Sequence, residues 1–221
     1  MENQDLIRAG LQQSPNEMPT IMTKRTIKPI TQEHFFNSLG WRYKSIVETR
    51  GKQFIKTENI KIQLQNITRL LFNNDRWGLL IKGSFGNGKT TVANALKQTI
   101  NEMISQHFFA NGEIYEWDWM QVINAREMIN NYFKGMKNGQ NFSIKGCKWL
   151  VIDDVGLDPA YVKLYGTEFY PFLEIVEYRY ERKLPTILVS NLKKEEIFEH
   201  YSDERLRDRF KEMFNSDRKS T

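Results

Sequence analysis

The sequence has a single cysteine, Cys147, so it can form neither an internal disulfide nor a zinc site built from several cysteines. It has no apolar run near the roughly 18–20 residues that a membrane-spanning helix requires. The N-terminus carries acidic residues and no apolar segment, so we expect no secretory signal. Glycine and proline are few, at 13 and 6 in 221 residues, which argues against a fibrous repeat. These absences favour a globular protein of the cytoplasm with no membrane partner.

What the chain does have is 40% hydrophobic and 13% aromatic residues, enough for one packed core with an extension. The formal net charge is +5, and most of the excess lies in residues 1–56, which hold nine Lys/Arg against five Asp/Glu. A basic extension of this kind is either a solvated tail or a contact surface for nucleic acid or an acidic partner. Residues 1–30 are polar and interrupted by prolines, so we expect them to be disordered.

Periodicity predicts the remaining elements. Apolar residues at helical spacing predict helices over about 31–50 and 60–71. Further along, strands alternate with helices, and residues 134–147 are expected to form a polar loop. The expected strands are 77–82, 114–117, 149–153 and 186–189, and the expected helices are 89–107, 122–133, 169–180, 193–199 and 202–214. Strands that alternate with helices indicate an α/β fold with a mainly parallel sheet.

A glycine-rich loop follows the first strand. Residues 83–90 read Gly-Ser-Phe-Gly-Asn-Gly-Lys-Thr and fit the pattern G-x-x-x-x-G-K-[ST] between a strand and a helix. Glycines let backbone N–H groups close around phosphate oxygens, and the helix N-terminus adds its positive end. Lys89 is expected to reach the β- and γ-phosphates of a nucleotide, and Thr90 to ligate Mg²⁺. The predicted nucleotide-binding residues are Gly83, Ser84, Phe85, Gly86, Asn87, Gly88, Lys89, Thr90 and Thr91.

Polar residues also follow the two later strands, at the edge where parallel α/β sheets bind ligands. Asp153 and Asp154 end the strand at 149–153 and look like a Walker B pair. In that role Asp153 binds Mg²⁺, and Asp154 orients the attacking water. Asn191 follows the strand at 186–189, and its amide could hold that water or the γ-phosphate. The alternative for Asn191 is a cap on the next helix.

A charged segment lies near the C-terminal end of the sequence, at residues 203–210. Leu206 and Phe210 share one helix face and are expected to point to the core, whereas Arg205 and Arg209 share another. A charge run of this kind is commonly a solvated helix face. The alternative is an arginine finger, a cation supplied to the ATP of a neighbouring subunit.

Four segments in this order, GSFGNGKTT, KWLVIDDVG, PTILVSNL and ERLRDRF, resemble those of AAA+ ATPases. The likeness is strongest to bacterial helicase loaders of the DnaC/DnaI type and to IstB transposition ATPases, and it covers about residues 60–214. It implies a P-loop fold, the cofactors ATP and Mg²⁺, ATP hydrolysis and ATP-dependent homo-oligomers. It also implies a replicative helicase or a transposase as partner, together with DNA. Arg209 corresponds to a finger that acts in trans, and Arg205 to an arginine of less certain role.

The sequence departs from this family in two respects. Asp154 stands where AAA+ proteins more often have glutamate, and a shorter side chain reaches the water less easily, so we expect slow turnover. No segment after Phe214 is recognised as the strand that usually follows the finger helix, or as the helical lid. The sheet is therefore expected to lack an edge strand, or to borrow one from residues 1–30. A small-molecule kinase and a non-hydrolysing ATP-dependent adaptor are the alternative functions.

The resemblance and the charge distribution together divide the chain into a basic extension (1–30), a helical segment (31–56) and an AAA+-like ATPase domain (57–221). Cations beside aromatic residues in the first two parts predict salt-sensitive, sequence-independent binding, with single-stranded DNA favoured. These cations are Lys24, Arg25, Lys28, Arg42, Lys44, Arg50, Lys52 and Lys56. Trp41 and Tyr43 are candidates for stacking on bases, although helical spacing favours core packing for Tyr43.

Overall fold

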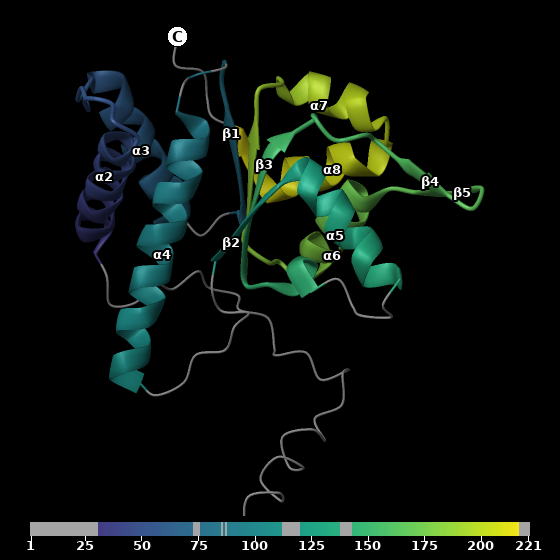
Figure 1. Cartoon of the computed structure of the whole chain (residues 1–221), viewed down its shortest axis with the longest axis horizontal. Helices are drawn as coiled ribbons and strands as arrows, with labels where there is room; N and C mark the ends of the chain where they lie inside the picture. Colours follow the sequence, from purple (N-terminus) through teal and green to yellow (C-terminus); the bar gives the residue numbers. More distant parts are fainter. Residues whose placement is uncertain are drawn as a thin grey trace, which may run out of the picture.

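The computed structural model describes residues 31–72, 76–84, 86, 88–111, 120–137 and 143–216. Its central element is a five-stranded sheet in which all pairs are parallel, with the strand order β2-β3-β6-β1-β7 (Figure 1). The strands are β1 (Gly78–Lys82), β2 (Met120–Asn124), β3 (Trp149–Val155), β6 (Thr186–Ser190) and β7 (Phe214–Ser216). The α/β fold with a parallel sheet that the sequence predicted is confirmed.

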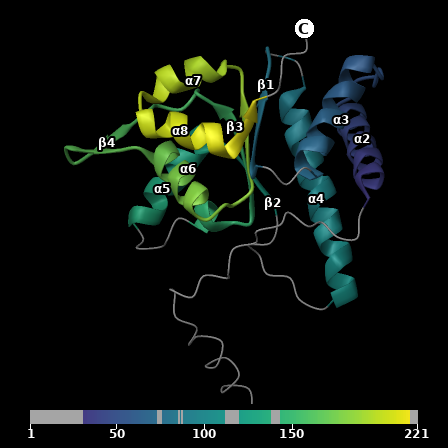
Figure 2. The same cartoon turned by 180° about the vertical axis from the view of Figure 1, so that it is seen from behind.

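Helices cover both faces of this sheet (Figures 1 and 2). One face is covered by α2 (Gln32–Thr49), α3 (Glu58–Phe72) and α4 (Lys89–Asn111). The other is covered by α5 (Ala125–Lys137), α6 (Pro171–Glu181), α7 (Lys194–Tyr201) and α8 (Glu204–Met213), with a short 3-10 helix, η2 (Ser143–Gly146), before β3. No helix in the described part of the chain is long and apolar enough to cross a membrane.

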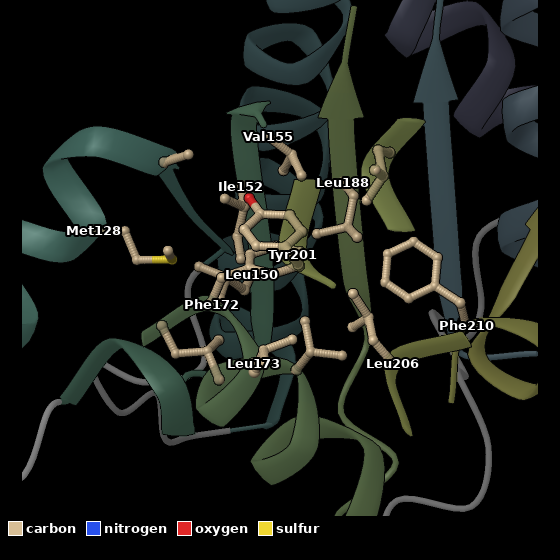
Figure 3. Packing of buried hydrophobic residues seen from close by; sticks show 14 of the residues in the cluster. Met128, Leu150, Ile152, Val155, Phe172, Leu173, Leu188, Tyr201, Leu206 and Phe210 are labelled. Atoms are coloured by element: carbon tan, nitrogen blue, oxygen red, sulfur yellow. The ribbon is translucent and has the colours of Figure 1, made fainter. Parts of the chain in front are cut away.

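The two faces have separate hydrophobic cores because consecutive side chains of a strand point to opposite sides. Leu79 and Ile81 of β1 pack with α2, α3 and α4, whereas Leu80 packs with the helices of the other face. Figure 3 shows this second core, in which the ring of Phe172 stacks on that of Tyr201 with 4.1 Å between ring centroids. The two cores hold the strands in place between the helices. The polar residues described below lie at the carboxyl ends of these strands.

The edge strand β7 corrects the sequence analysis, which expected the sheet to lack this strand or to borrow it from residues 1–30. β7 follows α8 directly and pairs in parallel with β1, with Gly78 opposite Phe214. A Cβ at Gly78 would lie 2.6 Å from Cδ1 of Phe214, so only glycine admits this ring. Arg76 also holds the segment, because its Nη1 donates to the carbonyls of Phe214, at 3.1 Å, and of Lys211.

The boundaries around β2 also differ from the expected ones. The strand expected at 114–117 lies outside the described residues, and β2 is formed by residues 120–124 instead. Val122, expected to start a helix, lies in β2 opposite Val151, and the helix α5 begins at Ala125. Val122 fits a helical period with the residues that follow, but the pairing of its backbone with β3 decides its conformation. Part of the expected loop at 134–147 is helical, since α5 continues to Lys137 and η2 follows.

An antiparallel hairpin that the sequence analysis did not predict connects β3 to α6. It consists of β4 (Val162–Leu164) and β5 (Thr167–Phe169), and it projects away from the body of the molecule (Figure 1). Tyr165 and Gly166 form its tip with φ of 51° and 84°, the left-handed conformation that a two-residue hairpin turn requires. Phe169, expected in the helix that follows, belongs to β5, and α6 begins at Pro171.

Candidate nucleotide-binding site

The glycine-rich loop joins β1 to α4 at the carboxyl edge of the sheet. Gly86 and Gly88 have φ of 81° and 74°, a conformation in which a side chain is strained. Lys89 is 7% exposed, and its Nζ donates to the carbonyls of Gly83 at 2.7 Å and Ser84 at 2.8 Å. The ammonium group thus lies inside the curve of the loop, where it can exchange these carbonyls for phosphate oxygens. The predicted members Phe85 and Asn87 lie outside the described residues.

Two carboxylates flank this ammonium group. Burial lowers the pKa of Lys89, and the negative charges of Asp153 and Asp154 oppose that shift by raising it. Lys89 lies near Asp153 and Asp154 because β1 and β3 end at the same edge of the sheet, with only β6 between them. The structure therefore brings together the lysine and both acidic residues that the sequence predicted for the site.

Thr90 and Asp153 form the candidate metal site. The hydroxyl of Thr90 is hydrogen-bonded to the carboxylate of Asp153, which is 6% exposed. Burial raises the pKa of Asp153, and the hydrogen bond from Thr90 lowers it. Mg²⁺ in nucleotide sites is commonly held by one or two such oxygen ligands together with phosphate oxygens and water. A hydroxyl and a carboxylate already in contact beside the phosphate loop fit that requirement.

Asp154 has an unusual backbone conformation. The pairing of β3 with β6 shifts register between Ile152 and Val155, and Asp154 in this bulge has φ of 58°. Its Oδ2 accepts a hydrogen bond of 2.8 Å from Nδ2 of Asn124, the last residue of β2. Strained backbone of this kind persists where its surroundings hold it, and it is frequent at functional sites.

Asn124 is a site residue that the sequence analysis missed. Its side chain joins two neighbouring strands, because its Oδ1 also accepts from the backbone N–H of Arg126 at 3.0 Å, which fixes the amide while Nδ2 donates to Asp154. The available signal was an asparagine at the end of an apolar strand. That signal was hidden because residues from 122 onward were assigned to a helix.

Ser190 and Asn191 follow the same edge. Ser190 is fully buried, and its Oγ donates to the carbonyl of Val155 at 2.6 Å, so it has a structural role. Asn191 is half-buried. The alternative in which it caps the next helix does not describe the structure, because the N-cap of α7 is Lys193, paired with Glu196. The amide of Asn191 thus lies one residue beyond β6, the strand between β1 and β3.

Arg209 lies apart from these residues. Its Nη2 donates to Oε1 of Glu177 on α6 at 2.5 Å, and its guanidinium lies 5.4 Å from the ring centre of Tyr180. Its side chain is 22% exposed and is not simply a solvated surface group. Arg205 is more exposed and pairs with Asp203 at the start of α8. Among the described residues, the contacts of Arg209 are with α6 and not with the phosphate loop of its own chain.

The parallel α/β fold agrees with the predicted fold class, and the glycine-rich loop between β1 and α4 has the position of a P-loop. Among solved structures the chain is similar to the DnaC helicase loader, with a TM-score of 0.54, 19% identity and coverage of 83% of this chain and 97% of that one. It is also similar, at a TM-score of 0.49, to AMPPCP-bound DnaA from Aquifex aeolicus (20% identity, 73% of this chain and 47% of that one). It is similar to DnaI as well, with a TM-score of 0.49, 21% identity and coverage of 73% of this chain and 86% of that one. No protein-family model and no curated protein sequence matches the chain, so these likenesses concern the fold.

Proposed function

We propose that this protein binds ATP with Mg²⁺ and hydrolyses it slowly, as a helicase-loader-like ATPase in the cytoplasm. One observation supports this above all: Lys89, the Thr90–Asp153 pair and Asp154 meet at one edge of the sheet. Lysine in that loop binds the β- and γ-phosphates, and a hydroxyl–carboxylate pair beside it suits Mg²⁺, which neutralises the developing charge. Asp154 then acts as the group that orients and polarises water, with Asn191 as its polar neighbour.

The proposal extends to assembly. Arg209 contacts α6 in the single chain, and we infer that it contributes to hydrolysis at the ATP of a neighbouring copy. ATP would then promote homo-oligomers, since the γ-phosphate contacts its own loop and a neighbour's guanidinium. The similarity in fold to a helicase loader supports a replicative helicase as the partner, and a transposase is the alternative. Both belong to DNA-linked machinery in replication or transposition.

The test of the proposed reaction is steady-state phosphate release from ATP, measured with and without single-stranded DNA. Slow release that requires Mg²⁺ supports the ATPase. Tight binding without release would instead indicate an adaptor for which ATP is a structural ligand. Transfer of the γ-phosphate to a nucleoside or small metabolite would indicate a kinase. The three functions thus give three different results in one assay.

Two neighbouring substitutions separate the roles of the acidic pair. Asp154→Asn is expected to leave ATP·Mg²⁺ binding near the wild-type value and to slow hydrolysis about a hundredfold, because only the orientation of water is lost. Asp153→Asn is expected to weaken the Mg²⁺-dependent part of ATP binding, since it removes a charged oxygen ligand. Binding is measured by titration with and without Mg²⁺, and turnover by phosphate release. Wild-type hydrolysis in both variants would contradict the assignment.

Several basic residues that the sequence predicted to bind DNA have partners within the protein. Of the basic residues predicted to bind it, Arg42 pairs with Glu102, Lys44 pairs with Glu48, and Arg50 donates to Thr91. Tyr43, one candidate for base stacking, is a core residue at 6% exposure, which confirms its core packing. Lys24, Arg25 and Lys28 lie outside the described residues. Carboxylate partners make Arg42 and Lys44 poorer contacts for DNA phosphates than the sequence suggested, and Arg50 is directed toward Thr91.

We propose the β4–β5 hairpin as a surface for single-stranded DNA. Tyr165 at its tip is 96% exposed, and Lys163, which pairs with Glu168 at 3.1 Å, lies 5.7 Å from the ring centre of Tyr161. Exposed aromatic faces suit stacking on bases without regard to sequence. The ring of Tyr165 lies outside both hydrophobic cores, so both of its faces are accessible to a base.

Replacing Tyr165 with alanine is expected to weaken binding of single-stranded DNA roughly tenfold, the effect of losing one stacked base. Fluorescence anisotropy with a labelled oligonucleotide measures it. Trp41→Ala is the matched control, because Trp41 is also exposed, at 60%, but lies on α2. A loss of affinity in the Trp41 variant but not in the Tyr165 variant would place DNA on α2 instead.

A further inference from the structure

Helix α2 reaches the phosphate loop and the start of α4 through Tyr43 and Arg50. The hydroxyl of Tyr43 lies so close to Gly88 that a side chain at position 88 would collide with it. An ion pair of 2.7 Å between Arg42 and Glu102 holds α2 against α4. The helix that precedes the ATPase strands therefore forms one wall of the proposed nucleotide site.

Arg50, the C-cap of this helix, donates from Nη1 to Oγ1 of Thr91 at 3.0 Å. Thr91 lies in the first turn of α4, which begins at Lys89, next to Val92, whose N–H donates to the carbonyl of Gly88 at 2.9 Å. The N–H groups of this turn are those that a helix start offers to an anion. The guanidinium of Arg50 thus lies beside the donors proposed to bind phosphate.

The direction of approach distinguishes Arg50 from the other cations. Successive helical residues are rotated by about 100°, so Thr90 and Thr91 point to different sides of α4. Thr90 contacts Asp153 on the metal side, whereas Thr91 contacts Arg50 on the side of α2. Arg50 therefore approaches the loop away from the place where the γ-phosphate and Mg²⁺ are expected.

The partners of Arg50 also leave it capacity for a ligand. A guanidinium has five N–H donors, and the hydroxyl of Thr91 takes one of them. Within the described ranges no carboxylate forms an ion pair with Arg50, whereas Arg42 and Lys44 on the same helix each have one. A cation beside an anion site without a neutralising carboxylate is suited to a phosphate.

We propose that Arg50 is a second cation of the nucleotide site, which binds the phosphate nearest the sugar. This inference rests on the proposed nucleotide binding. It makes α2 responsive to the presence of a nucleotide, ATP or ADP alike, because the contact does not involve the γ-phosphate. The end of α2 would then be ordered by any bound nucleotide, whereas Asp154 and Arg209 respond to ATP alone.

The test compares Arg50→Gln with wild type in titrations with ATP and with ADP. Both affinities are expected to fall roughly tenfold, and their ratio to stay unchanged, since one charge-assisted contact is lost from a phosphate that both nucleotides have. Arg50→Lys, which keeps the charge, is expected to recover part of the loss. Lys44→Gln is the matched control, because it removes the same charge from an exposed position of α2 and should bind as wild type does.

Three outcomes would overturn the inference. Wild-type affinity of Arg50→Gln for both nucleotides would leave Arg50 without a ligand. A loss for ATP alone would assign Arg50 to the γ-phosphate. A lower melting temperature of the nucleotide-free variant, with no recovery of binding in Arg50→Lys, would mean that Arg50 only fastens α2 to α4. If wild-type protein itself binds neither nucleotide, the proposed function fails instead.

Discussion

Replacing Lys89 with alanine is expected to reduce ATP affinity about a hundredfold or more while the protein stays folded. The side chain ends in an ammonium group that donates hydrogen bonds to two carbonyls of the phosphate loop. Without it, the β- and γ-phosphates lose their charged hydrogen-bond donor, and such contacts are among the strongest in proteins. Nucleotide titration measures the affinity, and circular dichroism checks the fold.

Lys97→Ala provides the control, because Lys97 belongs to the same helix but lies two turns further from the loop. It removes an equal charge and should bind ATP as wild type does. If Lys89→Ala binds ATP with wild-type affinity, the loop is not a phosphate site and the proposed function is wrong. A variant that no longer folds would be replaced by Lys89→Met, which keeps most of the buried chain without its charge.

The second large effect is expected from Arg209→Ala, which should bind ATP normally yet hydrolyse it about a hundredfold more slowly. An arginine finger stabilises charge on the transferring phosphoryl group and acts only in the assembled state. In the single chain the guanidinium is engaged by Glu177, at 2.5 Å, so assembly has to exchange this partner for a phosphate. Phosphate release at several protein concentrations measures the effect, and Arg205→Ala is the control on the same helix.

Mixing Arg209→Ala with Lys89→Ala tests whether the arginine acts across an interface. The first variant retains its phosphate loop, and the second can lend its intact arginine to a neighbour. Interfaces of the right polarity should then regain hydrolysis that neither variant shows alone. If mixtures that co-assemble by size-exclusion chromatography show no recovery, Arg209 acts within its own chain or only packs α8 against α6.

The features that sequence alone predicted are those encoded by neighbouring residues. The phosphate loop is a contiguous pattern between a strand and a helix, and Asp153 and Asp154 directly follow a buried apolar strand. Each can be read without knowing what packs against it. The parallel order of the sheet follows from the alternation of elements, and burial at Leu206 and Phe210 follows from helical spacing.

The missed features depend on pairing between distant segments. Residues 214–216 are too short and irregular to indicate a strand, and they become β7 only because β1 lies beside them. Asn124 gains its role from Asp154, which β2 and β3 bring into register. Similarly, the sequence places Arg50 in a cluster of basic residues and so predicts a DNA contact. Its hydrogen bond to Thr91 joins two helices that are distant in the sequence and cannot be predicted from neighbouring residues. The β4–β5 hairpin is an exception, since its Tyr165–Gly166 turn between alternating residues was a local signal left unused.

The position of β1 in the sheet has a consequence for the order in which the protein is built. Both of its neighbours, β6 and β7, come from the last part of the described chain. During synthesis the strand that carries the phosphate loop therefore has no partner until residues 186–190 have left the ribosome. Long-range parallel pairing forms slowly because the intervening chain must first be closed into a loop. We therefore expect the proposed nucleotide site to be among the last parts of the molecule to form, although its residues are synthesised early.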